Sequence, residues 1–317
     1  MGEGGAPLAP PPGVFAVTGA FGYTGRHITR RLLAGGRSVL TLTGHPERAG
    51  DLAGRVEVHP LDFNDPRRLT AALQEVEVLF NTYWIRFERG PVTFDRAVAS
   101  SRVLFLAAAE AGVRRIVHIS ITNPSEESPL PYFRGKALVE RALRDLTAAG
   151  GPTHAIIRPT VMFGGEDILL NNIAWLLRRF PLFPVLGRGD YPVQPVHVDD
   201  VAALAVALAD DTRNVVTDAV GPETFPFRDL VALIRRAVGS RAVLLQVPPD
   251  LGLTLGAVVG RMVRDVILTR DEVRGLMAGL LVSASPPTGT TRFSTWLRDN
   301  AVTVGRTYRS ELARHYV

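Results

Sequence analysis

The glycine-rich stretch VTGAFGYTG, from Val17 to Gly25, constrains the fold more than any other part of the chain. It overlaps the end of a short β-branched run, Val14–Thr18, and precedes an amphipathic helical pattern. Gly19 permits a tight turn, Gly22 lets the backbone approach a pyrophosphate, and Gly25 lets the helix pack close to the strand. The N-terminus of that helix attracts phosphates, because its free N–H groups and its dipole point at them. The stretch predicts a dinucleotide-binding turn, with a plain strand–turn–helix connection as the alternative.

Short apolar runs alternate with helical patterns through the first half of the chain. The expected strands are 14–18, 38–43, 56–60, 76–82, 115–120 and 154–158, and the expected helices are 26–34, 66–74, 93–111 and 133–149. Strands separated by helices pair in parallel through right-handed crossovers. These strands are uniformly apolar, as expected when both faces of a sheet are covered. The pattern predicts an α/β fold of the Rossmann type, a doubly wound parallel sheet.

The domain organisation follows from a change in composition. Residues 1–13, rich in Gly and Pro, are expected to form a flexible lead-in, and 14–160 a Rossmann domain that binds NAD(P). Prolines become frequent afterwards, so 161–317 is expected to form a smaller, mostly helical substrate lobe. Two later runs, Pro195–Val198 and Val215–Val220, resemble extensions of the sheet, so some segments of this lobe are expected to return to it.

Composition excludes several kinds of site. The chain has no cysteine, which excludes disulfides, zinc–thiolate sites and cysteine nucleophiles and fits a cytoplasmic protein. The net charge of +5 comes mostly from scattered arginines without long runs, which indicates a solvated surface and no nucleic-acid partner. The seven histidines show no metal-ligand spacing, so no metal is expected.

The most apolar segment, residues 251–266, is too short to cross a bilayer, which needs about 20 residues. Arg261 and Arg264 lie within it, so a peripheral contact with a membrane surface is one interpretation. A core helix or the face of a homodimer is the interpretation that we prefer from the sequence.

The loop after the second strand indicates which nicotinamide cofactor is bound. An acidic residue at the end of this strand would bond the ribose hydroxyls of NAD, but Thr43 and a glycine stand there. Arg26, His45 and Arg48 lie nearby and suit a 2′-phosphate, so NADP(H) is favoured over NAD(H). Glu47 would serve NAD(H) if the loop bends back.

The end of the third strand carries Asp62 and Phe63. Asp62 is placed to bond the adenine amine, and Phe63 to line the adenine pocket. The alternative is that Asp62 caps the helix that follows.

Tyr132 and Lys136 are four residues apart and share one face of a helix. An ammonium beside a phenol stabilises the phenolate and lowers its pKa, so Tyr132 could exchange a proton with a substrate oxygen. Lys136 could also hold the nicotinamide ribose. A hydroxyl partner for the substrate carbonyl is expected from Ser120 or Thr122, at the end of the fifth strand, although either could cap the turn that follows.

These features occur together in one known superfamily. They are the glycine turn, Asp62, Asn81, Tyr132 with Lys136, Arg158–Thr160 and Val196–Asp200. The combination, over residues 14 to about 235, resembles the extended or atypical branch of the short-chain dehydrogenase/reductases, which is NAD-dependent epimerase/dehydratase-like. The segments 163–167, 194–195 and 268–272 are similar to relatives of the nucleotide-binding accessory subunit of respiratory complex I.

The resemblance implies a Rossmann domain with NAD(P) as ligand. It places further cofactor contacts at Phe21, Tyr23, Thr24, Asn81, Thr82, Tyr83, Pro159 and Thr160. It places a small-molecule substrate, of nucleotide-sugar or quinone type, near Tyr83, Trp84, Met162 and Asn171. In this superfamily His197, Asp199 and Asp200 generally brace the substrate lobe, and Asp199 or Asp200 is a natural helix N-cap.

Two functions follow from these residues. The first is an NAD(P)-dependent oxidoreductase or epimerase with Tyr132 as acid/base. The second is a protein that holds NADPH for a structural or sensing purpose and docks on a partner or a membrane. The short loop 123–131 and Ile121 depart from the enzyme pattern, because the segment before the tyrosine is longer in extended enzymes.

Overall fold

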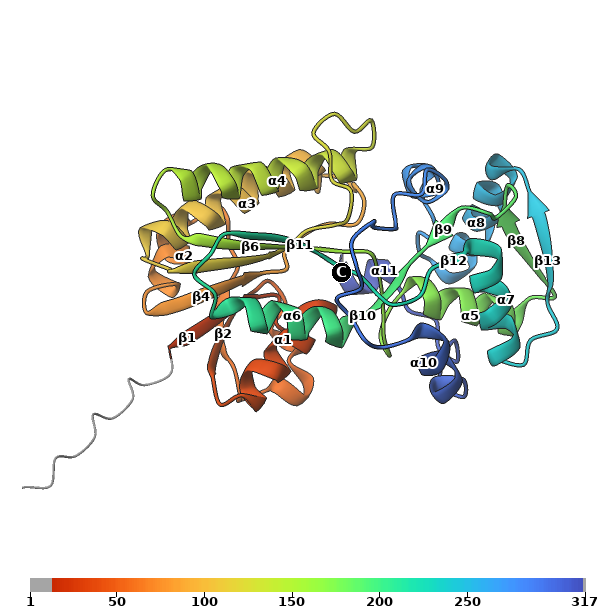
Figure 1. Cartoon of the computed structure of the whole chain (residues 1–317), viewed down its shortest axis with the longest axis horizontal. Coiled ribbons are helices and arrows are strands. Elements are labelled where there is room, and N and C mark those ends of the chain that lie inside the picture. Colours follow the sequence, from red (N-terminus) through yellow and green to blue (C-terminus); the bar gives the residue numbers. More distant parts are fainter. Residues whose placement is uncertain (1–12, 316–317) are drawn as a thin grey trace, which may run out of the picture.

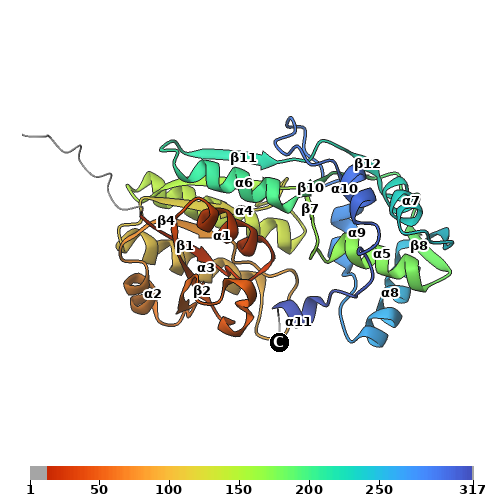
Figure 2. The same ribbon diagram turned by 90° about the horizontal axis from the view of Figure 1, so that it is seen from below.

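The computed structural model describes residues 13–315, so the predicted lead-in lies, except for Gly13, outside the described residues. The chain forms two lobes joined side by side (Figure 1, Figure 2). The strands are β1 Val14–Thr18, β2 Ser38–Thr43, β3 Glu57–Pro60, β4 Val76–Asn81, β5 Arg115–Ile119, β6 Thr153–Pro159, β7 Val161–Phe163, β8 Leu182–Leu186, β9 Pro192–Val193, β10 Pro195–His197, β11 Val215–Ala219, β12 Phe225–Pro226 and β13 Val243–Val247. The α-helices are α1 Tyr23–Ala34, α2 Pro66–Ala72, α3 Phe94–Glu110, α4 Pro131–Ala148, α5 Leu169–Arg179, α6 Val198–Ala209, α7 Phe227–Ala237, α8 Pro249–Val263, α9 Arg270–Met277, α10 Phe293–Asn300 and α11 Glu311–His315.

The first lobe is built on a seven-stranded sheet in the order β11-β6-β5-β4-β1-β2-β3. All of its strand pairs are parallel. Helices α2, α3 and α4 cover one face, and α1 and α6 cover the other (Figure 1). The prediction of a doubly wound α/β fold is confirmed, and every strand and helix predicted before residue 160 is present within three residues of its expected bounds.

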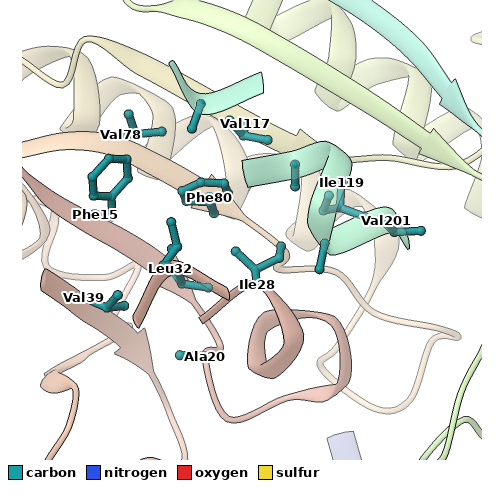
Figure 3. Close-up of a cluster of buried hydrophobic side chains, with 14 of the residues drawn as sticks. Phe15, Ala20, Ile28, Leu32, Val39, Val78, Phe80, Val117, Ile119 and Val201 are labelled. Carbon is teal, nitrogen blue, oxygen red and sulfur yellow. The ribbon is translucent and has the colours of Figure 1, made fainter. Parts of the chain in front are cut away.

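The sheet is apolar on both faces because both are buried. Figure 3 shows the face covered by α1 and α6, where strand side chains meet those of the two helices. Its labelled members are Phe15, Ala20, Ile28, Leu32, Val39, Val78, Phe80, Val117, Ile119 and Val201. The alternate strand positions, such as Ala16, Leu79 and Ile116, pack against α3 and α4 on the other face. Burying one such large side chain contributes about 1.5–3 kcal/mol, so this double layer fixes the register of the strands.

The strand order reverses between β1 and β4, and in open α/β sheets a ligand crevice lies at the carboxyl edge of such a point. β1 pairs with β2 on one side and with β4 on the other. The segments that follow β1 and β4 therefore lead to opposite faces of the sheet. Ligands of open α/β sheets usually bind where two such segments diverge. The glycine turn follows β1 and lies at this point.

The second lobe contains α5, α7, α8, α9 and α10 with two small two-stranded sheets, β12-β9 and β13-β8. The run Val215–Val220 joins the large sheet as β11, beside β6. The run Pro195–Val198 was expected to do the same, but it pairs instead with β7 in a separate pair of strands. The sequence pattern also missed β13, because its short run Val243–Val247 stands among helices.

Segment 251–266 lies mostly in α8, and it is not a core helix; the other interpretation preferred from the sequence, the face of a homodimer, stays a prediction. Of its helical residues only Gly252 and Gly260 are buried. Four apolar side chains at helical spacing are exposed, Leu251 by 48%, Leu255 by 40%, Val258 by 56% and Met262 by 69%. No helix among the described residues is both long and apolar enough to span a bilayer.

The close contact of Gly25 with the turn predicts the effect of a substitution. A Cβ at Gly25 would lie 2.2 Å from the carbonyl oxygen of Gly19. We expect Gly25→Ala to lower the free energy of unfolding in urea by about 1–3 kcal/mol, because the obstructing atoms belong to the backbone. Helix propensity alone predicts the opposite sign, a gain of about 1 kcal/mol.

The matched control is Gly44→Ala, since a Cβ at Gly44 would meet nothing within 4 Å. We expect this variant to be as stable as the wild type or slightly more so. Equal stability of the two variants would contradict the close-packing role of Gly25.

Candidate functional site

The glycine turn has the geometry that a bound pyrophosphate requires. Gly19 has φ of +64°, and its N–H donates to the carbonyl oxygen of Leu42 at 2.9 Å, which ties the turn to β2. The N–H of Gly22 donates to the Gly19 carbonyl at 2.8 Å. Helix α1 then begins at Tyr23 with no side-chain cap, so its first N–H groups are not satisfied by a capping side chain. The residues present fit the phosphates of a dinucleotide.

The cations expected after β2 do lie together. Arg26 donates from Nη2 to the carbonyl oxygens of Phe21 at 3.1 Å and Arg48 at 3.0 Å. His45 pairs with Glu47 at 3.3 Å, and the Thr43 hydroxyl accepts from the His45 N–H. The guanidinium of Arg26 therefore both shapes the loop and places positive charge at its edge.

The C-terminal helix α11 adds a cation to this edge that the sequence patterns did not reveal. Arg48 donates to the carbonyl oxygen of Arg314. The guanidinium of Arg314 lies 5.5 Å from the centre of the Tyr23 ring and also donates to the carbonyl oxygen of Glu166. Residues nearly 300 positions apart thus meet beside the glycine turn, which no local pattern can show.

At the end of β3, Asp62 accepts from the backbone N–H of Asn64 at 2.9 Å and from its side chain at 3.1 Å. The helix N-cap is Asp65, which accepts from Arg68 N–H, so Asp62 shapes the turn but does not cap α2. Phe63 packs against Tyr83 with ring centres 4.7 Å apart, which forms an aromatic pair on the expected adenine side.

A buried polar network closes the ends of β1 and β4. The hydroxyl of Thr18 donates to Asn81 Oδ1 at 3.1 Å and accepts from the N–H of Thr82 at 2.8 Å. The Thr82 hydroxyl donates to the Thr18 carbonyl, and the Asn81 amide contacts Nδ1 of His118 at 3.1 Å. Asn81 and Thr82 therefore fix the ends of β1 and β4 where the strand order reverses. The network also satisfies polar groups that would otherwise be buried without a partner.

Lys136 is buried, with 3% of its surface exposed, and Trp84 covers its ammonium. Nζ donates to the carbonyl oxygen of Ile119 at 2.8 Å and lies 4.7 Å from the centre of the Trp84 ring. Burial lowers the pKa of Lys136 to about 7, although the carboxylate of Glu140 acts in the opposite direction. Gly135 makes the close approach possible, since a Cβ there would lie 2.9 Å from the indole.

The ring of Tyr132 contacts Trp84 edge to face, with the ring centres 6.0 Å apart and the ring planes at 89°. Burial raises the pKa of Tyr132 well above its ordinary range, and the carboxylates of Glu272 and Glu311 add to the rise. The prediction that Lys136 lowers this pKa is wrong for the present arrangement. The physical reason is that the phenol is buried beside carboxylates, while the ammonium is held by Ile119 and Trp84.

Arg86 joins these carboxylates into an ion-pair group in which Glu311 is buried and the other two side chains are half-buried. Nε of Arg86 lies 2.5 Å from Glu272 Oε1, and Nη1 lies 3.1 Å from Glu311 Oε2. The group links the loop after β4 to α9 and α11. It occupies the region between the lobes beside Tyr132, and sequence reasoning did not find it because its members come from three distant segments.

The two candidate hydroxyls have different surroundings. Ser120 donates to Glu140 Oε1 at 2.6 Å, and Glu140 pairs with Arg158 at 2.5 Å, so this hydroxyl belongs to a structural group. Thr122 donates its N–H to the carbonyl of Pro159, and its buried hydroxyl has no hydrogen-bond partner. The buried hydroxyl of Thr160 is also without a partner. An unpaired buried hydroxyl is costly, so Thr122 and Thr160 are the ones poised to accept a ligand.

Three more residues expected at the site, Thr24, Met162 and Asn171, differ in what they contact. Thr24 contacts the sulfur of Met162 at 3.7 Å, across the gap between the lobes. Asn171, expected near the substrate, is engaged with backbone instead, donating to Thr307 O at 2.9 Å and accepting from Gly305 N–H at 2.9 Å. It therefore anchors the C-terminal segment, and this engagement argues against a substrate contact.

The acidic cluster at the start of α6 braces the two lobes. Asp199 contacts His27 at 2.6 Å, and Asp200 accepts from the N–H groups of Thr290 and Thr291. The helix N-cap is His197, where an aspartate was expected. Among residues 13–315 no cluster of His, Cys, Asp and Glu suits a metal ion.

With this geometry established, comparison with known proteins identifies the family. Residues 15–221 match the NAD dependent epimerase/dehydratase family. The chain belongs to this family. Family membership and the glycine turn together support a nicotinamide dinucleotide as its ligand.

Three similar proteins illustrate the range of the family. NADH dehydrogenase (ubiquinone) 1 alpha subcomplex subunit 9 of Rattus norvegicus is 34% identical over 68% of this chain, and the alignment spans 56% of the rat protein. Ceramide reductase of Caulobacter vibrioides is 28% identical over 78% of this chain and 77% of its own. The structure of Citrobacter sp. triphenylmethane reductase with NADP(H) has a TM-score of 0.71 at 20% identity, covering 91% of this chain and 99% of that chain. The first of these is a subunit of an NADH dehydrogenase and the second is a ceramide reductase, so the family alone does not fix the activity.

The buried ammonium predicts a pH dependence that can be measured directly. Lys136 is the single lysine of the sequence, so lysine labelled at the side chain gives one NMR signal. We expect this signal to titrate with a midpoint near 7, well below the ordinary 10.5, because burial disfavours the charged form.

The same shift affects stability with a defined sign. Between pH of about 7 and 10.5 the unfolded chain holds a proton on Lys136 that the folded chain has lost. The free energy of unfolding therefore rises with pH through this window, by about 1.4 kcal/mol for each pH unit that this group controls. Lys136→Met should remove this part of the pH dependence. A lysine midpoint near 10, or an unchanged slope in the variant, would contradict the burial of a titrating amine.

Proposed function

We propose that the chain is an NADP(H)-dependent oxidoreductase whose reacting end lies at Tyr132, Lys136 and Thr122. The observation that supports it most is the position of Lys136. Of the 36 Lys and Arg residues, 35 are arginine and one is this buried lysine. Arginine stays protonated in proteins, whereas a buried lysine can lose its proton near neutral pH. A chain that uses arginine everywhere else has a compact, titratable cation at the position where this chemistry needs one.

Each residue has a distinct role in this proposal. The glycine turn and the start of α1 hold the pyrophosphate, and Lys136 holds the nicotinamide ribose. A bound nicotinamide cofactor supplies or accepts hydride. Tyr132 exchanges a proton with the substrate oxygen, and the unpaired hydroxyl of Thr122 donates to it. The high pKa of Tyr132 favours its protonated form, which suits proton donation during reduction of a carbonyl.

Two sets of contacts favour a reductase role over an epimerase role. Arg86, Glu272 and Glu311 form an ion-pair group whose carboxylates lie close enough to Tyr132 to raise its pKa. Asn171, expected to bind substrate, is committed to the backbone of residues 305 and 307. These polar side chains are engaged within the chain, so fewer of them remain to bind the hydroxyls of a nucleotide sugar, whereas a compact carbonyl or quinone head group needs fewer.

Turnover tests the proposal. We expect NADPH to be oxidised with quinones or aldehydes as acceptors, followed by its absorbance, and we expect Tyr132→Phe to lower the rate at least a hundredfold. Tyr191→Phe is the matched control, because Tyr191 is a buried tyrosine of the second lobe whose hydroxyl has no partner. Turnover that is insensitive to Tyr132→Phe would exclude Tyr132 as the proton donor.

The cofactor preference has its own test. We expect wild-type protein to bind NADPH more tightly than NADH in calorimetric titrations. Arg48→Gln should lower the affinity for NADPH about tenfold and leave the affinity for NADH nearly unchanged, because a charge-assisted contact to the 2′-phosphate is lost. Arg55→Gln, an exposed arginine of the same loop region, is the control. Equal weakening of both cofactors would show that Arg48 does not read the 2′-phosphate.

A second candidate function is favoured by the position of Trp84. Its ring contacts both Tyr132 and Lys136, and Lys136 is held by the Ile119 carbonyl. In this arrangement the pair serves packing, and the protein would hold NADPH as a structural or sensing ligand. The exposed stripe of α8, flanked by Arg261 and Arg264, would then dock it on an anionic membrane surface.

The two candidates separate on one preparation. NADPH that copurifies with the protein, identified by mass spectrometry, with no turnover on any acceptor supports the second. Turnover lost in Tyr132→Phe supports the first.

A further inference from the structure

A hollow among the described residues lies in the second lobe. It has a volume of about 660 Å³ and lies between the C-terminal ends of α5 and α7. Its lining residues are Leu177, Arg178, Arg179, Phe180, Pro181, Val238, Gly239, Ser240, Arg241, Ala242 and Arg306. Four of these are arginines, and no Asp or Glu is among the described lining residues. A hollow of this size falls in the range of small-molecule sites.

The arginines of the hollow divide into a floor and a rim. Arg178 donates to the carbonyl oxygens of Val238 at 3.2 Å and Val304 at 3.0 Å, so it is fixed in place by the backbone. Burial lowers the pKa of Arg178, and the nearby charge of Arg306 lowers it further, so these cations repel each other. Arg241 and Arg306 are exposed at the rim. An anion in the hollow would relieve this repulsion.

An exposed apolar strip begins at the edge of the hollow. Pro181 and Ala242 of the lining run directly into β8 and β13, and Val243 N–H donates to the Pro181 carbonyl at 2.8 Å. Leu182 and Val243 are opposite each other in the register and are exposed by 53% and 52%. Leu245, two residues on and therefore on the same face, is exposed by 42%.

The strip continues to α8 at the other end of this small sheet. A Cβ at Gly252 would lie 2.0 Å from the side chain of Leu186, so α8 packs closely on the end of β8. Figure 1 and Figure 2 both show α8 beside β8 at the end of the lobe away from the large sheet. The basic hollow, the exposed apolar face of β8 and β13, and α8 are thus contiguous in the second lobe.

We propose that the hollow binds the phosphate of an anionic phospholipid headgroup while the apolar strip contacts the acyl region of the bilayer. Charge complementarity decides the occupant, because a cationic hollow without carboxylates recognises a phosphate monoanion or dianion. The adjoining exposed Leu182, Val243 and Leu245 distinguish a lipid from a free phosphate, which has no apolar part to bury.

Vesicle co-sedimentation of the full chain tests the proposal. We expect binding to vesicles of equal parts phosphatidylcholine and phosphatidylglycerol and little binding to phosphatidylcholine alone. The double variant Arg241→Gln/Arg306→Gln should lower the partition coefficient about thirty-fold, since each arginine at an anionic surface contributes about a factor of five. The matched control, Arg213→Gln/Arg298→Gln, removes the same charge from two exposed arginines outside the hollow and the apolar strip and should change it much less.

Two further measurements test the role of the apolar strip and distinguish a lipid from free phosphate as the ligand. Val243→Ser/Leu245→Ser should weaken vesicle binding several-fold without loss of the fold, because both side chains are exposed. Calorimetric titration should show a soluble short-chain phosphatidylglycerol binding at least tenfold more tightly than inorganic phosphate. Equal losses in the rim and control double variants, no vesicle binding by wild type, or equal affinity for phosphate and short-chain lipid would each overturn the proposal.

Discussion

The close approach of Gly25 to the Gly19 carbonyl is the constraint on which the candidate site depends. It places the start of α1 directly over the end of β1, with only backbone between them. The first N–H groups of the helix then face the crevice where β1 and β4 diverge. The Thr18–Asn81–Thr82 network fixes the other wall of this crevice with buried hydrogen bonds. Cofactor binding therefore follows from backbone geometry, and side chains only refine it.

Burial dominates the electrostatics at the reacting end. Tyr132 and Lys136 share a helix face, but Trp84 and the Arg86 ion-pair group determine their surroundings. Burial pushes both pKa values away from the charged forms, up for the phenol and down for the ammonium. Burial thus favours the neutral phenol at Tyr132 and shifts Lys136 toward its neutral amine.

The first lobe could be predicted from sequence because its signals are local. Each strand is a continuous apolar run, and each helix has apolar residues at regular spacing. The glycine turn joins the first strand to the first helix. Contacts between distant segments could not be predicted in this way. Arg314 at the glycine turn, Glu140 with Ser120 and Arg86 with Glu311 all join residues that no spacing relates. Gly135 inside a helix was the available signal for the Trp84 contact, since a glycine there marks a close approach.

The second lobe shows why an apolar run alone misleads. Residues 251–266 have the composition of a core helix, yet in α8 only Gly252 and Gly260 are buried, and Leu251, Leu255, Val258 and Met262 are exposed. Glycines at 252 and 260 let one face approach β8 and the segment around 265, so the helix attaches by its smallest residues. A helix that needed its leucines for folding would turn them inward, where each would gain about 1.5–3 kcal/mol. The outward position of Leu251, Leu255, Val258 and Met262 therefore does not serve the core of this chain.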